Sequence, residues 1–495
     1  MPASLHRPQW KTSLAAIVRT SSHGPMGLLA AAFLALAAGA CLAPDSSPPR
    51  ARNVIVVLTD DQGWADLGCL GTPGIVTPRL DRLAREGARL TDFYVAQPVC
   101  SASRAALLTG CYPQRIGIAG ALGPGSRVGL ASEETTLAEL CAARGLSTAH
   151  FGKWHLGDAP AFSPLRHGFQ RFLGLPYSHD MWPHHPESPD AWGDLPLYDD
   201  ERVVAWNADP ARYTREFSEQ ALAWMRGELA AGRPFFLYLA HPLPHVPLAV
   251  SADFRGRTGA GLYADVLAEI DAGVGALLDE LERHDAARDT LFVFTSDNGP
   301  WLSYGDHAGS AGILREGKGT TFEGGVRVPC LVRWPGVIPA GRVIHAPAMT
   351  IDVVPTVASA LGTPLPALPI DGRDLLPLLT GASEESPHPA LFFSYGENAL
   401  EAVRAGRWKL HFPHGYRTLR GPPGRDGIPG TYEYGARIGL ELFDLERDPG
   451  EQHDVAARHP EVVARLSALA DAHRAELGDS LAGVVGRGNR PAGRP

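Results

Sequence analysis

The stretch Asn53–Gly63, NVIVVLTDDQG, decides the fold of this chain. Its first part, Asn53–Thr59, is an uninterrupted aliphatic and β-branched run, which is typical of a strand buried on both faces of a parallel sheet. The run then breaks at two aspartates, a glutamine and a glycine. We therefore predict a central strand that delivers polar side chains to its carboxyl end.

Outward from this strand, strand-like and helix-like segments alternate. Thr77–Gly87 begins with a threonine cap and a proline in the first turn and ends on glycine, a pattern that predicts a helix. Alternating strands and helices imply a parallel sheet covered by helices on both faces, with functional sites beyond the carboxyl ends of its strands. The other predicted strands are Leu146–Phe151, Phe235–Ala240, Leu291–Thr295 and Val328–Arg333, and the other predicted helices are Ser103–Thr109, Thr136–Arg144, Thr214–Ala231, Leu262–His284 and Ile351–Leu361.

The polar segment Gly381–Pro389 indicates a boundary. After it come the strand-like runs Ala402–Phe412 and Leu440–Leu445, and then a helix from about Glu461 to Leu477. The predicted fold class is thus α/β, with a large mixed, mostly parallel sheet sandwiched by helices. A smaller C-terminal α+β domain with an antiparallel sheet follows.

Composition favours a globular enzyme. The chain has 495 residues, of which 44% are hydrophobic and 20% charged, so a disordered or coiled-coil class is excluded. The formal net charge is −9 and no basic block stands out, so we expect no nucleic-acid partner.

The N-terminus resembles an export signal. Basic residues precede the uncharged run Met26–Ala40, which is shorter than the ~20 residues that span a bilayer and suits a signal peptide. Ala38–Ala40 fits ordinary cleavage, and together with Cys41 it also resembles a bacterial lipoprotein box. We expect export, to the periplasm, to a membrane through a possible lipid anchor at Cys41, or into the medium.

Cysteine spacing leaves the redox state open. No pair has the C-x2-C spacing of a zinc site. If Cys41 and Cys100 are set aside, four cysteines remain, which allow three disulfide pairings or a set of buried thiols. The six cysteines are Cys41, Cys69, Cys100, Cys111, Cys141 and Cys330.

Two predicted strands end in oxygen-rich pairs. Asp60 and Asp61 follow the first strand, and Asp297 and Asn298 follow Leu291–Thr295. Adjacent side chains of a regular strand face opposite sides, so they converge only where the strand breaks, which the following glycines permit. Either pair alone is usually a turn or a helix cap. Two pairs in one sheet favour a hard cation, Ca²⁺ or Mg²⁺.

Cys100 begins the string CSASRAALLTGCYPQRIG, at the start of a predicted helix. A cysteine at a helix N-terminus is either a thiolate nucleophile or a buried thiol. The whole string, downstream of VLTDDQGWADLG, resembles the sulfatase family, in its arylsulfatase A-like branch within the alkaline phosphatase superfamily. In that family the motif is Cys-x-Pro-x-Arg, and its cysteine is oxidised after synthesis to formylglycine.

Further strings agree in order with the resemblance. GKWHLG contains Lys153 and His155, on alternate positions that share one side if the segment is extended. PFFLYLAHPLPHVP contains His245, GKGTTFEGGVRVP contains Lys318, and LELFDLERDPGEQHDV resembles the tail of the smaller domain. The match extends from about Asn53 to Val455.

Some positions depart from the family pattern. Ala102 occupies the usual proline position, and Cys111 replaces a usual arginine. His241 lies four residues before His245, and the family's His-x-Pro pattern favours His245 as the functional histidine.

The resemblance implies an enzyme that hydrolyses sulfate esters to an alcohol and sulfate. It implies 3-oxoalanine (formylglycine) at Cys100, whose hydrate is the nucleophile, and one Ca²⁺ or Mg²⁺. A formylglycine-generating maturation enzyme is then a partner, and the substrate is a sulfated sugar, a sulfated lipid or an aryl sulfate. The implied metal residues are Asp60, Asp61, Cys100, Asp297 and Asn298. The implied catalytic residues are Cys100, Arg104 (orientation), Lys153 and Lys318 (positive charge), His155 (base), and His245 or Lys318 as proton donor.

The implied division of the chain has five parts. They are a signal peptide at 1–40, a linker at 41–52, a catalytic sulfatase domain at 53–380, a C-terminal α+β domain at 381–480 and a disordered tail at 481–495. Two irregular segments, Tyr177–Tyr198 with His184 and His185 and the loop Pro413–Tyr434, are expected to form walls of the substrate pocket.

Two other functions remain open at this stage. One is a phosphatase or phosphodiesterase of the same superfamily, which would not need the Cys100 motif and usually takes a second metal. The other is a non-catalytic binder of sulfated glycans, if Cys100 stays unmodified. The intact set of acidic residues and lysines speaks against the second alternative.

Overall fold

A computed structural model describes residues 50–495 except residue 186. The predicted signal peptide, Cys41 and nearly all of the predicted linker lie outside these residues. The described part belongs to one compact unit, and the division at residues 380 and 381 stays a prediction. Within it, no helix has both the length and the apolar character needed to cross a membrane.

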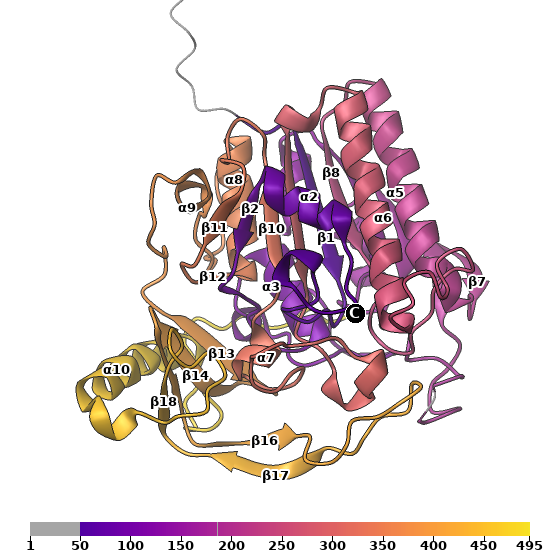
Figure 1. Cartoon of the computed structure of the whole chain (residues 1–495). Coiled ribbons are helices and arrows are strands. Elements are labelled where there is room, and N and C mark those ends of the chain that lie inside the picture. Colours follow the sequence, from indigo (N-terminus) through magenta and orange to yellow (C-terminus); the bar gives the residue numbers. More distant parts are fainter. Residues whose placement is uncertain (1–49, 186) are drawn as a thin grey trace, which may run out of the picture. The chain divides into compact units, whose positions relative to one another are not determined.

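A ten-stranded mixed sheet forms the centre of this unit (Figure 1). Its central strand β1 (Asn53–Thr59) pairs in parallel with β8 on one side and β9 on the other. The strands from β9 to β5 are all parallel, whereas β10 and β6 are antiparallel to their neighbours β9 and β5. The order is β11 (Arg342–Ile344), β2 (Ala88–Leu90), β10 (Cys330–Arg333), β9 (Thr290–Ser296), β1, β8 (Phe235–Ala240), β4 (Ser147–Lys153), β5 (Arg171–Leu175), β6 (Pro196–Asp199) and β7 (Arg202–Trp206).

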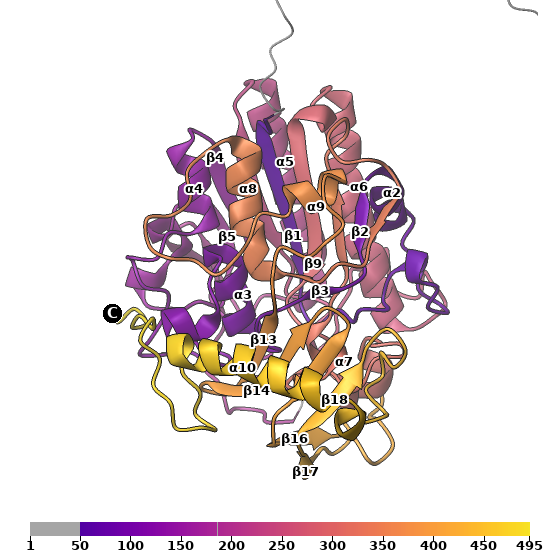
Figure 2. The same ribbon diagram turned by 90° about the vertical axis from the view of Figure 1, so that its left-hand side faces the viewer.

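Strand β1 is apolar throughout because both of its faces are covered. Val54 and Val56 join one hydrophobic cluster with residues of α3, α4 and α8, while Ile55 and Val57 join another with residues of α2, α5 and α6. Figure 2 shows α3 and α8 in front of the sheet, with α5 and α6 behind it. The predicted α/β architecture is therefore confirmed. These helices are α2 (Pro78–Glu86), α3 (Cys100–Thr109), α4 (Leu137–Ala143), α5 (Tyr213–Ala230), α6 (Leu262–Arg283) and α8 (Val353–Leu361).

The smaller antiparallel sheet follows, in the order β13 (Leu391–Tyr395), β14 (Ala399–Ala405), β15 (Trp408–His411) and β18 (Glu441–Asp444), with helix α10 (Pro460–Leu477) packed against it. The run Ala402–Phe412, predicted as one strand, is instead a hairpin of β14 and β15. The chain reverses at Gly406, whose φ is +58°, a conformation that glycine adopts without strain.

The predicted loop Pro413–Tyr434 contains regular structure at both ends. Strands β16 (His414–Thr418) and β17 (Glu433–Ile438) pair in a separate two-stranded antiparallel sheet (Figure 1). The described residues also form two short helices, α7 (Glu323–Val326) and α9 (Leu376–Thr380), the strand pair β3 (Phe93–Tyr94) and β12 (Ala348–Met349), and several 3-10 turns.

The structure differs from the expected disordered tail at 481–495. Gly493 and Gly129 exchange backbone hydrogen bonds of 2.9 and 3.1 Å, and the Arg490 guanidinium lies 2.6 Å from the buried Glu134 carboxylate. This carboxylate needs a cationic partner because a buried unpaired charge is costly, and the tail supplies one. The sequence predicts disorder here because the segment has no periodic pattern of its own, and contacts with distant residues leave no such pattern.

The described cysteines are all unpaired: Cys69, Cys100, Cys111, Cys141 and Cys330 carry free thiols. All but the half-buried Cys69 are buried. Of the two interpretations left open by the spacing, the structure therefore has buried thiols rather than disulfides.

Candidate active site

The carboxyl ends of β1 and β9 bring the acidic residues together. Thr59 lies beside Ser296 in the parallel register, so the residues that follow them are neighbours. Asp61 has a φ of +62°, which turns its carboxylate to the same region as that of Asp60. The Asp61 backbone N–H donates to Asp297 Oδ1 over 3.1 Å. The strand break thus permits the convergence that a regular strand forbids.

Cys100 points into this acidic cluster from the first turn of α3. Its side chain is buried, and its Sγ lies 3.5 Å from Asp60 Oδ1. One ligand atom from each of Asp60, Asp61, Cys100 and His245 lies within 4.8 Å of every other. These four buried side chains form a candidate metal and reaction centre.

Asp297 and Asn298 complete the set of oxygen donors. Asp297 lies beside Asp61, and Asn298 Nδ2 donates to Asp61 Oδ1 over 2.7 Å. The Asn298 Oδ1 atom is buried and accepts no hydrogen bond from the described residues. An orphaned amide oxygen beside carboxylates fits a hard divalent cation, because such a cation would satisfy it.

Three cations balance the carboxylates. The buried Arg104 guanidinium donates to Asp60 over 3.0 Å and to Asp297 over 2.9 Å. Lys153 pairs with Asp60, and Lys318 lies 2.8 Å from Asp61. Three carboxylates and three cations sum to zero charge, so a bound divalent cation would leave the site positive. Such a site favours an anionic substrate.

The carboxyl groups respond differently to burial. Lys153 and Arg104 overcome the effect of burial and hold the pKa of Asp60 well below its usual range. Burial, with a contribution from Asp60, raises the pKa of Asp297 to about 6, and burial also raises the pKa of Asp61. Burial thus raises the pKa of two of the three carboxyl groups among these residues alone, and a bound cation would oppose that effect.

The Cys100 thiol is not activated. Burial and the neighbouring Asp60 carboxylate raise its pKa well above the usual thiol value. The protonated thiol is a poor nucleophile, so the simple thiolate interpretation of the helix N-terminus is not supported.

Both candidate histidines are neutral at pH 7. His245 Nδ1 lies 2.6 Å from the Val246 carbonyl oxygen and its Nε2 lies 3.6 Å from Asp61 Oδ2, while burial and then Lys318 lower its pKa to about 4. His155 Nε2 lies 2.8 Å from the Leu122 carbonyl oxygen, and burial lowers its pKa well below the usual value. Each ring therefore has one nitrogen free to accept a proton.

The structure tests two expectations about histidines: that His155 shares one side of a strand with Lys153, and that His245 rather than His241 belongs to the site. Strand β4 ends at Lys153, and His155 has a φ of +63°, so the pair does not share one side of an extended strand. His241 is buried, but neither of its ring nitrogens has a hydrogen-bond partner within residues 50–495 as described, and it is not part of the four-residue cluster, which contains His245.

Sequence reasoning missed residues around the lysines. Ser178 Oγ accepts from Lys153 Nζ over 3.1 Å. The Trp301 ring centre lies 4.5 Å from Lys318 Nζ and 5.5 Å from the His245 ring centre. Asp180 is half-buried; although burial acts in the opposite direction, His245 and Ser178 hold its pKa below the usual range. Two features of the sequence could have indicated these residues. Trp301 directly follows TSDNGP, and Ser178 and Asp180 lie in the expected pocket wall.

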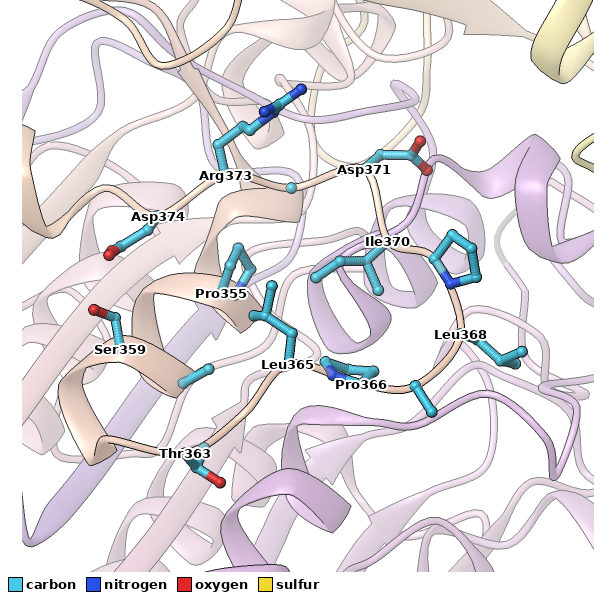
Figure 3. Close-up of a pocket in the computed structure, with 14 residues that line it drawn as sticks. Pro355, Ser359, Thr363, Leu365, Pro366, Leu368, Ile370, Asp371, Arg373 and Asp374 are labelled. Atoms are coloured by element: carbon cyan, nitrogen blue, oxygen red, sulfur yellow. The ribbon is translucent and has the colours of Figure 1, made fainter.

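A separate pocket of about 710 Å³ lies beside helix α8 (Figure 3). The proline-rich loop 363–374 wraps around it, and Pro355 and Ser359 line its helical side. None of the candidate site residues contributes to its lining. We therefore do not place the reaction there.

The buried cluster of carboxylates, cations and a cysteine fits an enzyme that acts on anionic esters. Residues 52–363 match the Sulfatase family, and residues 386–488 match the C-terminal region of aryl-sulfatase. The chain therefore belongs to the sulfatase family, whose curated relatives are sulfuric ester hydrolases, and it is an enzyme of sulfate ester hydrolysis.

Individual relatives are similar along most of their length. Arylsulfatase A of Homo sapiens is 42% identical over 476 residues, which cover 90% of each chain. Steryl-sulfatase of Mus musculus is 37% identical, with 92% of this chain and 87% of the relative covered. Among solved structures, the PsFucS1 sulfatase from Pseudoalteromonas sp. has a TM-score of 0.76 at 28% identity, covering 86% of this chain and 90% of that one.

Proposed function

We propose that this enzyme hydrolyses sulfate monoesters through formylglycine made from Cys100, with one Ca²⁺ or Mg²⁺ held by Asp60, Asp61, Asp297 and Asn298 beside it. The single observation that carries the proposal is the approach of Cys100 to the ligand atoms of Asp60, Asp61 and His245, all within 4.8 Å of one another in a buried cluster. Oxygen ligands favour a hard cation over zinc.

The bound cation would supply positive charge for a sulfate oxygen, and formylglycine hydrate would supply a hydroxyl nucleophile. Arg104 holds Asp60 and Asp297 in place by donating to both carboxylates. Lys153 and Lys318 place ammonium groups at the same centre, where low exposure to water strengthens their attraction for an anionic ester.

Proton transfer is divided between residues of different charge. Asp61 and neighbouring negative charge overcome burial and raise the pKa of Lys318, so its ammonium stays protonated and is our proposed donor to the leaving oxygen. The neutral His245 is the weaker candidate for that role. His155, also neutral and with Nδ1 unpartnered among the described residues, is the proposed base.

The proposal includes a partner and a location. Cys100 is only 2% exposed, so a formylglycine-generating maturation enzyme, which supplies the oxidant, must act before the site closes. Export from the cytoplasm, with or without a lipid on Cys41, fits the N-terminal sequence.

The proposed substrates are sulfate esters of a sugar, a lipid alcohol or a phenol. Names among the relatives include steryl-sulfatase and N-acetylgalactosamine-6-sulfatase, so sterol and sugar sulfates are the first natural classes to test. The positive charge that a bound divalent cation would leave at the side-chain cluster fits any of these monoanions.

The test is the mass of the tryptic peptide 90–104 from protein made with and without a formylglycine-generating system. We expect the aldehyde only in the first preparation, together with hydrolysis of an aryl sulfate. An unmodified thiol in both preparations would contradict the proposal and favour a non-catalytic binder. The aldehyde with turnover of an aryl phosphate alone would favour a phosphatase.

A further inference from the structure

The hairpin of β16 and β17 contacts the segment 315–319, which contains Lys318. Three consecutive residues of β16 take part. Arg315 Nη2 donates to the Tyr416 hydroxyl over 2.9 Å, and Thr418 Oγ1 donates to Glu316 Oε1 over 2.7 Å. Between these two contacts lies Arg417, whose guanidinium reaches the backbone of Lys318 itself.

Arg417 holds Lys318 in two ways. Its Nε donates to the Lys318 carbonyl oxygen over 3.1 Å, and its Nη2 donates to the same oxygen. Its guanidinium carbon also lies 5.8 Å from the ring centre of Trp301, whose ring faces Lys318 Nζ at 4.5 Å. Tyr432, 4.5 Å from the guanidinium, covers Arg417 in turn. One side chain thus touches both the backbone of the lysine and the aromatic ring beside its ammonium.

The segment needs an external support because its backbone is irregular. Glu316 has a φ of +56°, a left-handed conformation that persists only where the surroundings impose it. Gly319 has a φ of +77°, and a Cβ at this position would lie 2.7 Å from Arg417 Nη2. Glycine therefore permits the close approach of the guanidinium to the turn.

We propose that Arg417 is a positioning residue for Lys318, so that the C-terminal hairpin sets the place of the proton donor in the sulfatase site. The proposal rests on the function proposed above, in which Lys318 protonates the leaving oxygen. A planar guanidinium with two parallel donors fixes the carbonyl more firmly than an ammonium does. A displacement of about 1 Å in a catalytic group can cost roughly 100-fold in rate.

The test uses the full-length matured enzyme and a series of aryl sulfates whose phenols differ in pKa. For Arg417→Ala we expect kcat to fall about 10- to 100-fold on the poorest leaving group, with KM changed less than about threefold. The loss should shrink as the leaving group improves, because a good leaving group needs no proton. A loss of equal size on every substrate would overturn the proposal.

Two further variants test whether the loss of kcat in Arg417→Ala has a merely structural cause. Arg417→Lys keeps one donor and should recover part of the lost kcat. Arg437→Ala removes an exposed arginine of β17, the other strand of the hairpin, and should leave kcat and its leaving-group dependence unchanged. An Arg417→Lys enzyme that folds but is as slow as Arg417→Ala would contradict the need for a donor to the Lys318 carbonyl.

A double-mutant cycle separates this proposal from the proposed function. If Arg417 acts through Lys318, Lys318→Ala and Lys318→Ala/Arg417→Ala should have the same kcat within about twofold. Losses that multiply would mean that Arg417 acts elsewhere, while the sulfatase assignment would stand. A matured wild-type enzyme without sulfatase activity would instead contradict the function itself.

Discussion

Asp61 shows at the level of a single residue why the centre exists. Its φ of +62° lies in the left-handed region, which residues with a Cβ adopt uncommonly, although aspartate and asparagine do so more often than most. The cost, of order 1 kcal/mol or more, is offset by its hydrogen bonds from Asn298 and Lys318. The strain brings a second carboxylate to the cation site.

We therefore expect Asp61→Asn to weaken metal binding while the protein still folds. Asparagine tolerates the same backbone conformation but removes one negative charge, so Ca²⁺ affinity measured by calorimetry should fall roughly tenfold or more. Asp285→Asn is the control, since Asp285 is exposed and also left-handed, with a φ of +53°. Unchanged Ca²⁺ affinity in Asp61→Asn would mean that Asp61 is not a ligand.

His167 gives a prediction about pH. The ring is fully buried and neither nitrogen has a partner among the described residues, and burial lowers its pKa to about 4. The unfolded chain binds this proton near pH 6.5 and the folded chain only near pH 4. Its contribution to stability is thus present above pH 6.5 and is lost as the pH falls toward 4.

His167→Gln should flatten this pH dependence by about 1.4 kcal/mol per pH unit between pH 6.5 and 4, whatever its effect at pH 7. The measurement is the free energy of unfolding by urea at several pH values. His453→Gln, in a side chain 79% exposed, should leave the slope unchanged. Equal slopes for wild type and His167→Gln would show that His167 is solvated or charged in the folded state.

At the scale of elements, helix α4 is an example of an element whose start is predicted by local sequence alone. Thr136–Arg144 is predicted from its threonine cap, and the structure has the helix at Leu137–Ala143 with Thr136 as N-cap. Thr136 Oγ1 accepts from the Glu139 backbone N–H over 3.1 Å, and the Glu139 carboxylate accepts from Thr136 N–H over 2.7 Å. This reciprocal capping box is encoded within four residues of sequence.

Thr136→Ala should lower the free energy of unfolding by about 1–2 kcal/mol, because it removes the cap and a second bond from Thr136 Oγ1 to the His167 carbonyl oxygen at 2.8 Å. Thr136→Ser keeps the hydroxyl and should retain most of that stability. The free energies of unfolding of both variants are measured by thermal and urea unfolding. Equal losses of stability in the two variants would assign the effect to the methyl group instead.

Other elements were less predictable for physical reasons. Helix α3 begins at Cys100 rather than at Ser103, because its N-cap residue Val99 has no side chain that signals a start. Helix α8 begins at Val353, two residues later than predicted, because Thr350–Asp352 form a tighter 3-10 turn first. By contrast, β8 has the predicted bounds Phe235–Ala240, since its apolar run ends abruptly.

At the scale of the whole molecule, a buried ion network joins the C-terminal sheet to helix α7, which precedes β10 of the large sheet. Lys409 of β15 is fully buried and lies 2.9 Å from Glu323 and 3.1 Å from Glu451. Glu323 begins α7, five residues after Lys318. The network therefore connects the C-terminal sheet to the segment that follows the proposed proton donor.

Lys409→Met should destabilise the enzyme by about 3–5 kcal/mol, because two buried carboxylates lose their shared cation. Arg458→Met, at an exposed position, is the matched control. Adding Glu323→Gln to Lys409→Met should restore part of the stability by removing one of the orphaned charges. A Lys409→Met enzyme as stable as wild type would mean that the network does not stabilise the contact between the C-terminal sheet and α7.

The central strand, the polar pairs at two strand ends and the Cys100 motif could be predicted without coordinates, because each is encoded in a few consecutive residues. The contact between Asp61 and Asp297, 236 positions apart, and that between Arg417 and Lys318 became known only from the folded chain. Strand register and the docking of the C-terminal hairpin depend on packing between distant segments. Local periodicity carries no information about such contacts, so the support of the site could not be predicted from the sequence.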